Sequence, residues 1–232
     1  MMSYPYAFLF DLDGTLAETA PDLVGAMNHV LHQHNIDPVP TTHVRDMIGG
    51  GARVILERGL AFNHIKWDDE KLDTATEELV AYYYDHIADA SHLFDGVQDC
   101  LQTIQQAGFG CAVVTNKRYG LAEKLLTALQ IDGYFQTLIG GDSLPTRKPE
   151  PDMLQQAATD LDTPIANCLM IGDSEADTKA AQAAGMACLC VDFGYSRTPV
   201  TELGAQAIIS HYDEFWPAAK RCLPALKTQI NL

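Results

Sequence analysis

Short apolar runs alternate with segments of helical periodicity along most of this chain. The run Ala7–Phe10 is followed directly by polar residues and a turn signal, which is typical of a buried strand. From Asp95 onward strand-like and helix-like segments alternate, and this predicts an α/β fold with a mostly parallel sheet covered by helices on both faces. Further strands are expected at Gly110–Thr115, Thr137–Ile139, Cys168–Ile171 and Ala187–Val191, with helices at Val97–Ala107, Leu121–Leu129, Asp152–Leu161 and Ala176–Ala184.

The stretch from about Ala20 to Leu93 breaks this alternation, because it has several helix-period segments and no clear buried strand. Helices are expected at Asp22–Gln33, Arg53–Leu60 and Glu77–Ile87, with a flexible turn at Ile48–Ala52. The sequence therefore predicts a core domain made of residues 1–17 and 94–232 and a helical insert made of residues 18–93.

Composition and charge narrow the class of protein. The chain has 232 residues, of which 47% are hydrophobic and 20% charged, as is ordinary for a soluble globular protein with a full core. A formal net charge of -16 disfavours nucleic acid and anionic membranes as partners, because those contacts depend on clustered Lys and Arg. None of the six cysteines has Cys-x-x-Cys spacing, and neither a signal peptide nor a membrane span is expected before Asp11. A cytoplasmic protein with reduced thiols is expected.

Two carboxylates stand directly after the first apolar run, in Asp11-Leu12-Asp13-Gly14-Thr15. Ligands bind outside the carboxyl ends of the strands in open α/β sheets, so this position indicates chemistry. Because Asp13 already lies in the turn, both carboxylates can point into one cleft. One acid can then attack a substrate while the other moves protons.

Two further features follow later strands. Thr115 and Asn116 offer a hydroxyl and an amide that can donate hydrogen bonds to an anionic oxygen, and capping of the following helix is an equally weighted alternative. Lys148 is a point charge suited to phosphate, in a backbone stiffened by the prolines of Lys148-Pro149-Glu150-Pro151. A lysine in such a loop, taken alone, is more often solvated.

A second acidic pair occurs in Gly172-Asp173-Ser174-Glu175-Ala176-Asp177, again after an apolar strand. Several hard oxygen ligands near one point suit Mg²⁺, which prefers a few carboxylates together with water and phosphate oxygens. The alternative is that Asp173 and Asp177 only cap and charge the start of the next helix.

The chain resembles the haloacid dehalogenase superfamily in four motifs, in their order and over nearly its whole length. The motifs are Asp11-Leu12-Asp13-Gly14-Thr15, Thr115-Asn116, Lys148-Pro149 and Gly172-Asp173-x-x-x-Asp177. The resemblance implies a Rossmann-like sheet whose five strands, numbered along the chain, lie in the order 5-4-1-2-3. It also identifies the helical insert as an all-helical cap domain placed after the first strand.

The resemblance implies a Mg²⁺-dependent phosphomonoester hydrolase that works through an aspartyl-phosphate. Asp11 would be the nucleophile, and Asp13 would protonate the leaving oxygen and then activate water. Mg²⁺ would be held by Asp11, the backbone carbonyl of Asp13 and Asp173, with Asp177 orienting the metal's water shell. The residues implied to bind the transferring phosphoryl group are Thr115, Asn116 through its backbone, and Lys148.

Within the superfamily the chain is similar to the phosphoglycolate phosphatase branch, which implies 2-phosphoglycolate as the small phosphorylated metabolite it acts on. The matching segments are Ala20-Pro21-Asp22-Leu23, Ile48-Gly49-Gly50-Gly51-Ala52 with Glu57-Arg58, Val114-Thr115-Asn116-Lys117, Ile139-Gly140-Gly141-Asp142 and Gly194-Tyr195. Phosphatases of sugar phosphates such as N-acetylmuramic acid 6-phosphate, or of pyrophosphate, share the core motifs. A phosphosugar mutase similar to β-phosphoglucomutase, or a catalytically silent binding module, would also be compatible with this fold.

The insert carries the candidate specificity residues. The glycine turn Gly49, Gly50 and Gly51, with Arg45 or Arg53 nearby, can receive a small carboxylate through its backbone N–H groups. For each arginine alone, the favoured interpretation is a surface position on an amphipathic helix. The assembly is expected to be a monomer or a homodimer.

Overall fold

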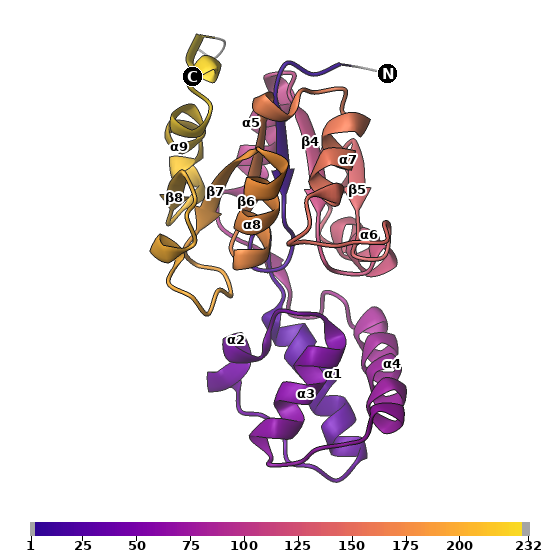
Figure 1. Cartoon of the computed structure of the whole chain (residues 1–232). Coiled ribbons are helices and arrows are strands. Elements are labelled where there is room, and N and C mark those ends of the chain that lie inside the picture. Colours follow the sequence, from indigo (N-terminus) through magenta and orange to yellow (C-terminus); the bar gives the residue numbers. More distant parts are fainter. Residues whose placement is uncertain (1–2, 229–232) are drawn as a thin grey trace. The chain divides into compact units, whose positions relative to one another are not determined.

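The chain folds into two compact units, and the computed structural model describes residues 3–228. The first, which we call the core unit, combines Met1–Ala17 with Leu93–Leu232, and the second, the helical unit, is Glu18–His92 (Figure 1). Strands β2 (Ala17–Glu18) and β3 (His92–Leu93) pair with each other where the chain passes between the units.

A six-stranded parallel sheet forms the centre of the core unit, in the order β5-β4-β1-β6-β7-β8. Its strands are β1 (Ala7–Phe10), β4 (Gly110–Val114), β5 (Thr137–Ile139), β6 (Cys168–Gly172), β7 (Ala187–Val191) and β8 (Ala207–Ile209). The α/β class and the order of the five predicted strands are thus confirmed. Strand β8 adds an edge beyond β7 that the sequence pattern did not predict.

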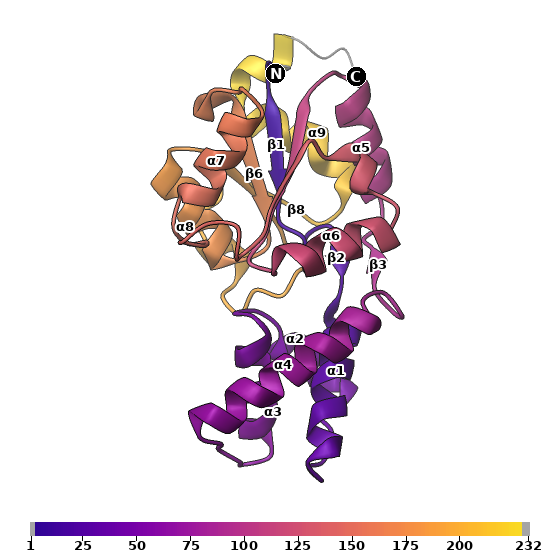
Figure 2. The same cartoon turned by 90° about the vertical axis from the view of Figure 1, so that its right-hand side faces the viewer.

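Helices cover both faces of this sheet, so every β1 side chain is buried. Ala7 and Leu9 belong to a cluster with α7 and α8, whereas Phe8 and Phe10 pack against Phe215 of α9. Figure 2 shows α7 and α8 on one side of the strands and α5 and α9 on the other. The helices of this unit are α5 (Val97–Gln106), α6 (Tyr119–Ala128), α7 (Asp152–Asp160), α8 (Glu175–Ala184) and α9 (Phe215–Cys222).

Four α-helices build the helical unit, and α1 packs against both α3 and α4. They are α1 (Ala20–Gln33), α2 (Val44–Met47), α3 (Ala52–Phe62) and α4 (Asp69–Asp85). The predicted start of the last helix at Glu77 is wrong by eight residues. The Asp68 side chain accepts a hydrogen bond from the Lys71 N–H at 2.9 Å, and this N-cap starts α4 at Asp69.

Short 3₁₀ helices lie between or after the α-helices and strands. The 3₁₀ helices are Thr41–His43, Asp132–Tyr134, Ile165–Asn167, Val200–Glu202, Tyr212–Glu214 and Pro224–Thr228. All six cysteines are free thiols. Over residues 3–228, none of the helices combines the length and the apolar character needed to cross a membrane.

The buried carboxylate of Asp22 ties the beginning of the helical unit to its end. Its oxygens accept hydrogen bonds from the N–H groups of Ala90 and Ser91 and from the Ser91 hydroxyl, at 2.6–3.0 Å. We expect Asp22→Ala to lower the free energy of unfolding by about 2–4 kcal/mol, because it leaves these donors without an acceptor. Urea unfolding of the full chain measures this, with Asp37→Ala at an exposed position as the control. Equal losses in the two variants would contradict the role given to Asp22.

Candidate active site

Carboxylates meet at the carboxyl end of the central strands. Asp11 follows β1 and Asp173 follows β6, and the Asp11 N–H donates to the Ile171 carbonyl at 2.9 Å, which holds the start of the turn to the neighbouring strand. Because parallel neighbours end at the same edge of a sheet, the two acids come together although they are far apart in sequence. The structure places Asp11 and Asp173 with Asp177 in one buried cluster.

Lys148 lies inside this cluster. Its ammonium is 2.6 Å from Asp177 Oδ1 and 3.0 Å from Asp11 Oδ1, and it donates to the Val114 carbonyl at 2.7 Å. Burial opposes the charge, but Asp11 and Asp177 outweigh it and hold the pKa of Lys148 above its ordinary range. The residue is 3% exposed, so the alternative of a solvated loop lysine is wrong.

Asp177 caps the following helix, which is one of the two alternatives that the sequence left open, and it also pairs with Lys148. Its Oδ2 accepts hydrogen bonds from the Ser174 hydroxyl at 2.6 Å and from the Ser174 N–H at 3.1 Å, which forms the capping box of α8. Its other oxygen pairs with Lys148. With both oxygens engaged, Asp177 caps a helix and orients the lysine at the same time.

Carboxylates outnumber ammonium groups in this cluster. One ligand oxygen from each of Asp11, Asp173 and Asp177 lies within 4.8 Å of the others. Burial raises the pKa of Asp11 to about 6, against the opposing charge of Lys148, and burial followed by the charges of Asp177 and Asp11 raises the pKa of Asp173 well above its ordinary value. If all three carboxylates are ionised, one ammonium leaves two negative charges uncompensated. This donor set fits a divalent cation that prefers oxygen ligands, such as Mg²⁺.

The loop after β7 holds Asp173 in place. The Tyr195 N–H donates to Asp173 Oδ2 at 2.5 Å, and a Cβ built on Gly194 would overlap the Cβ and Oδ2 of Asp173. Sequence reasoning noted Gly194-Tyr195 only as a matching segment. The structure gives it a function, since only glycine at 194 lets the loop approach the carboxylate.

We expect Gly194→Ala to displace Asp173 and to lower the phosphatase activity that the motifs predict about 10-fold or more, in line with the cost of losing support for a metal ligand. The activity should also need more Mg²⁺ to reach its maximum. Titrating activity against Mg²⁺ concentration measures both effects. Gly120→Ala is the matched control, because a Cβ on Gly120 in α6 meets nothing within 4 Å. An unchanged Mg²⁺ requirement in Gly194→Ala would contradict this assignment.

Asp13 is paired with Lys117, which sequence reasoning noted only in a matching segment and gave no role. Lys117 Nζ lies 2.9 Å from Asp13 Oδ1 and 3.1 Å from Oδ2, and the Lys117 side chain is only 4% exposed. The sequence could have indicated this lysine by its position two residues after Thr115, in the segment that follows β4. A lysine there shares the edge of the sheet where the acids gather.

Thr115 and Asn116 do not cap the next helix, because α6 begins at Tyr119 with Arg118 at its N-cap. The capping alternative is therefore wrong. The Thr115 N–H donates to the Ile139 carbonyl at 3.0 Å, and the Asn116 side-chain amide donates to the Lys148 carbonyl at 2.8 Å. The Asn116 side chain thus links the Thr115-Asn116 motif to the Lys148-Pro149 motif. Its predicted contact with phosphate would be made by its backbone.

Both candidate arginines of the helical unit are paired within that unit. Arg45 forms an ion pair with Glu18 at 3.0 Å, and its side chain is 57% exposed. Arg53 pairs with Asp69 at 2.7 Å and with Glu57 at 3.4 Å. The further partner of Arg53 is Asp73. These surface positions agree with the interpretation favoured for each arginine alone.

The glycine turn of the helical unit is built around a different arginine. Gly49, Gly50 and Gly51 have φ values of 95°, 88° and 93°. Arg58 donates to the carbonyls of Met47, Ile48 and Gly49 at 2.9, 2.6 and 2.8 Å. Arg58 thus fixes the turn, and sequence reasoning gave it no role. A contact between the turn and the substrate's carboxylate stays a prediction.

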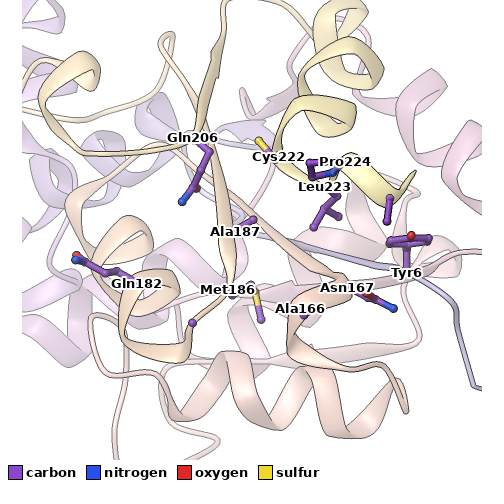
Figure 3. Close-up of a pocket in the computed structure, with 12 residues that line it drawn as sticks. Tyr6, Ala166, Asn167, Gln182, Met186, Ala187, Gln206, Cys222, Leu223 and Pro224 are labelled. Carbon is purple, nitrogen blue, oxygen red and sulfur yellow. The ribbon is translucent and has the colours of Figure 1, made fainter. Parts of the chain in front are cut away.

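A cavity of about 480 Å³ lies at the opposite end of the sheet. Figure 3 shows it between the C-terminal segment around Cys222 and the residues that precede β6 and β7, among them Asn167 and Met186. Within the described part of the chain none of its lining residues carries a charged side chain. Because a phosphate site needs cationic or clustered N–H donors, this cavity does not fit a phosphorylated substrate.

Comparison with known proteins gives consistent matches. The family model described as haloacid dehalogenase-like hydrolase matches residues 8–191. Phosphoglycolate phosphatase of Caulobacter vibrioides is 39% identical over 217 residues, covering 94% of this chain and 90% of the relative. The enzyme of the same name from Colwellia psychrerythraea is 36% identical over 218 residues, covering 92% and 96%. The crystal structure of a predicted phosphoglycolate phosphatase from Haemophilus somnus 129pt superposes with a TM-score of 0.86 at 28% identity, covering 94% and 99%.

Proposed function

This chain belongs to the haloacid dehalogenase-like hydrolases and is a phosphatase, and we propose that it hydrolyses 2-phosphoglycolate to glycolate and inorganic phosphate with Mg²⁺. The observation that carries the proposal is the buried cluster in which Lys148 bridges Asp11 and Asp177 beside Asp173. The identity to phosphoglycolate phosphatases over nine-tenths of the chain supports the substrate.

Asp11 and Asp13 carry the two chemical steps. A carboxylate oxygen of Asp11 attacks phosphorus, and the ester P–O bond breaks with its electron pair on the glycolate oxygen, which takes a proton from Asp13. Asp13 then takes a proton from water as the water oxygen attacks phosphorus. The bond from phosphorus to Asp11 breaks, its electron pair returns to the carboxylate, and inorganic phosphate leaves.

The remaining residues bind and orient. Thr115, the backbone of Asn116 and Lys148 hold the phosphoryl oxygens, which is the larger part of catalysis in phosphoryl transfer. Asp11, Asp173 and the backbone carbonyl of Asp13 would hold Mg²⁺. When bound, the ion offsets repulsion between the attacking carboxylate and the phosphate, which is about 4 kcal/mol for unit charges at about 4 Å and an effective dielectric near 20.

A phosphate-release assay over a panel of substrates tests the proposal. The panel contains 2-phosphoglycolate, sugar phosphates including N-acetylmuramic acid 6-phosphate, and pyrophosphate, each with and without Mg²⁺. We expect the highest kcat/KM for 2-phosphoglycolate and loss of activity in EDTA. A clear preference for a sugar phosphate would overturn the substrate but not the chemistry. A chain that releases no phosphate from any of them would be a mutase or a silent binding module.

A further inference from the structure

We propose that Lys117 is a positioning residue that holds the side-chain carboxyl group of Asp13 in the orientation needed for proton transfer to the leaving oxygen. The inference rests on the proposed function, because it concerns the acid of that same reaction. Its basis is the ion pair between Lys117 and Asp13, which lies within the core unit and joins segments 104 residues apart.

The contact restrains how the carboxylate can turn. One ammonium lies 2.9 Å from Oδ1 and 3.1 Å from Oδ2 of Asp13, so rotation about the Cβ–Cγ bond would break at least one hydrogen bond. The lysine side chain is almost completely buried, whereas the Asp13 side chain is 20% exposed. Lys117 therefore holds the carboxylate of Asp13 from its buried side and leaves part of that carboxylate accessible to solvent.

The backbone of Lys117 is itself anchored. The Gly141 N–H donates to the Lys117 carbonyl at 2.7 Å, and the Tyr119 N–H donates to Asp142 Oδ1 at 2.7 Å. A Cβ on Gly141 would overlap the Asn116 carbonyl, so only glycine lets the two loops approach this closely. The segment Ile139-Gly140-Gly141-Asp142, to which the mechanism gives no role, thus holds the lysine in place.

The two buried lysine side chains, Lys117 and Lys148, pair with different acids. Lys148 pairs with Asp11 and Asp177, whereas Lys117 pairs with Asp13. Replacing Lys117 therefore leaves Lys148 in place beside the nucleophile Asp11. Its loss should affect the step in which Asp13 gives a proton, and it should affect that step most when the leaving group needs the proton.

Two substrates with different leaving groups test this. The oxygen of 2-phosphoglycolate leaves as a poor alkoxide unless it is protonated, whereas 4-nitrophenyl phosphate releases an acidic phenol as its anion. For Lys117→Met we expect kcat for 2-phosphoglycolate to fall about 10²-fold with KM nearly unchanged, the lower end of what general acid catalysis supplies. The first-turnover burst of 4-nitrophenolate, which reports transfer to Asp11 alone, should keep nearly its full rate.

Three further variants sharpen the test. Lys117→Arg keeps a cation beside Asp13 and should recover a large part of the lost kcat. Gly141→Ala moves the lysine through its backbone and should show the same contrast between the two substrates, which keeps the test decisive if Lys117→Met fails to fold. Lys179→Met removes an exposed lysine paired with Glu175 and should leave both rates unchanged.

Two outcomes would overturn the inference. Equal losses with both substrates would mean that Lys117 only supports the fold or the site as a whole. A loss carried by KM would mean that it binds substrate. If the unmodified protein hydrolyses a different alkyl phosphate best, the proposed substrate fails, and the same comparison with that ester still decides the role of Lys117.

Discussion

Replacing Asp11 with Asn is expected to lower kcat/KM for 2-phosphoglycolate by at least about 10⁴-fold, because an amide cannot serve as the attacking nucleophile. The substitution keeps the size of the side chain, so the fold should survive. It also removes one of the three buried carboxylates that compete for a single ammonium. The thermal midpoint of the metal-free variant should therefore equal or exceed that of the unmodified protein.

The covalent intermediate gives a second readout of this prediction. With ³²P-labelled substrate and an acid quench, the unmodified protein should retain label that hydroxylamine releases, as expected of an acyl phosphate. Asp11→Asn should retain none. Asp99→Asn, at an exposed position in the first turn of α5, is the matched control and should behave as the unmodified protein does. Residual activity above about one-tenth in Asp11→Asn would exclude Asp11 as the nucleophile.

The fold and the acidic cluster could be predicted because local signals specify them. An apolar run that ends in a carboxylate marks both a buried strand and the edge where ligands bind, as at Phe10 and Asp11. The same signal at Ile171 to Asp173 placed the second acid. Parallel pairing of β1 with β6 then brings the two ends together, and no detail of side-chain packing was needed.

The supporting contacts could not be predicted, because they join segments whose spacing carries no period. The hydrogen bond from Tyr195 to Asp173 spans 22 residues and the ion pair between Lys117 and Asp13 spans 104. A lysine or a glycine in a loop is compatible with many environments, and the tertiary fold decides which one it meets. Arg58 shows the same limit, since its three carbonyl acceptors are visible only once α2 and α3 are folded.

Lys148→Met is expected to lower both activity and stability. The buried ammonium lies 2.6 Å from Asp177 and 3.0 Å from Asp11, and Met fills a similar volume without a charge. Breaking a buried ion pair from one side costs about 3–5 kcal/mol, since the remaining charge stays buried without its partner. We therefore expect the free energy of unfolding in EDTA to fall by about this amount, and kcat/KM to fall about 10³-fold because a phosphoryl-binding cation is lost.

Added Mg²⁺ separates this electrostatic effect from loss of packing. If the variant is destabilised by carboxylates that have lost their counter-charge, a divalent cation held by Asp11 and Asp173 should raise its thermal midpoint more than it raises that of the unmodified protein. Activity should stay low, because the ion does not replace the lysine at the phosphoryl oxygens. Lys179→Met, at an exposed ion pair, should change neither quantity. A Lys148→Met protein as stable in EDTA as the unmodified one would show that the buried ion pair contributes nothing to holding the acids together.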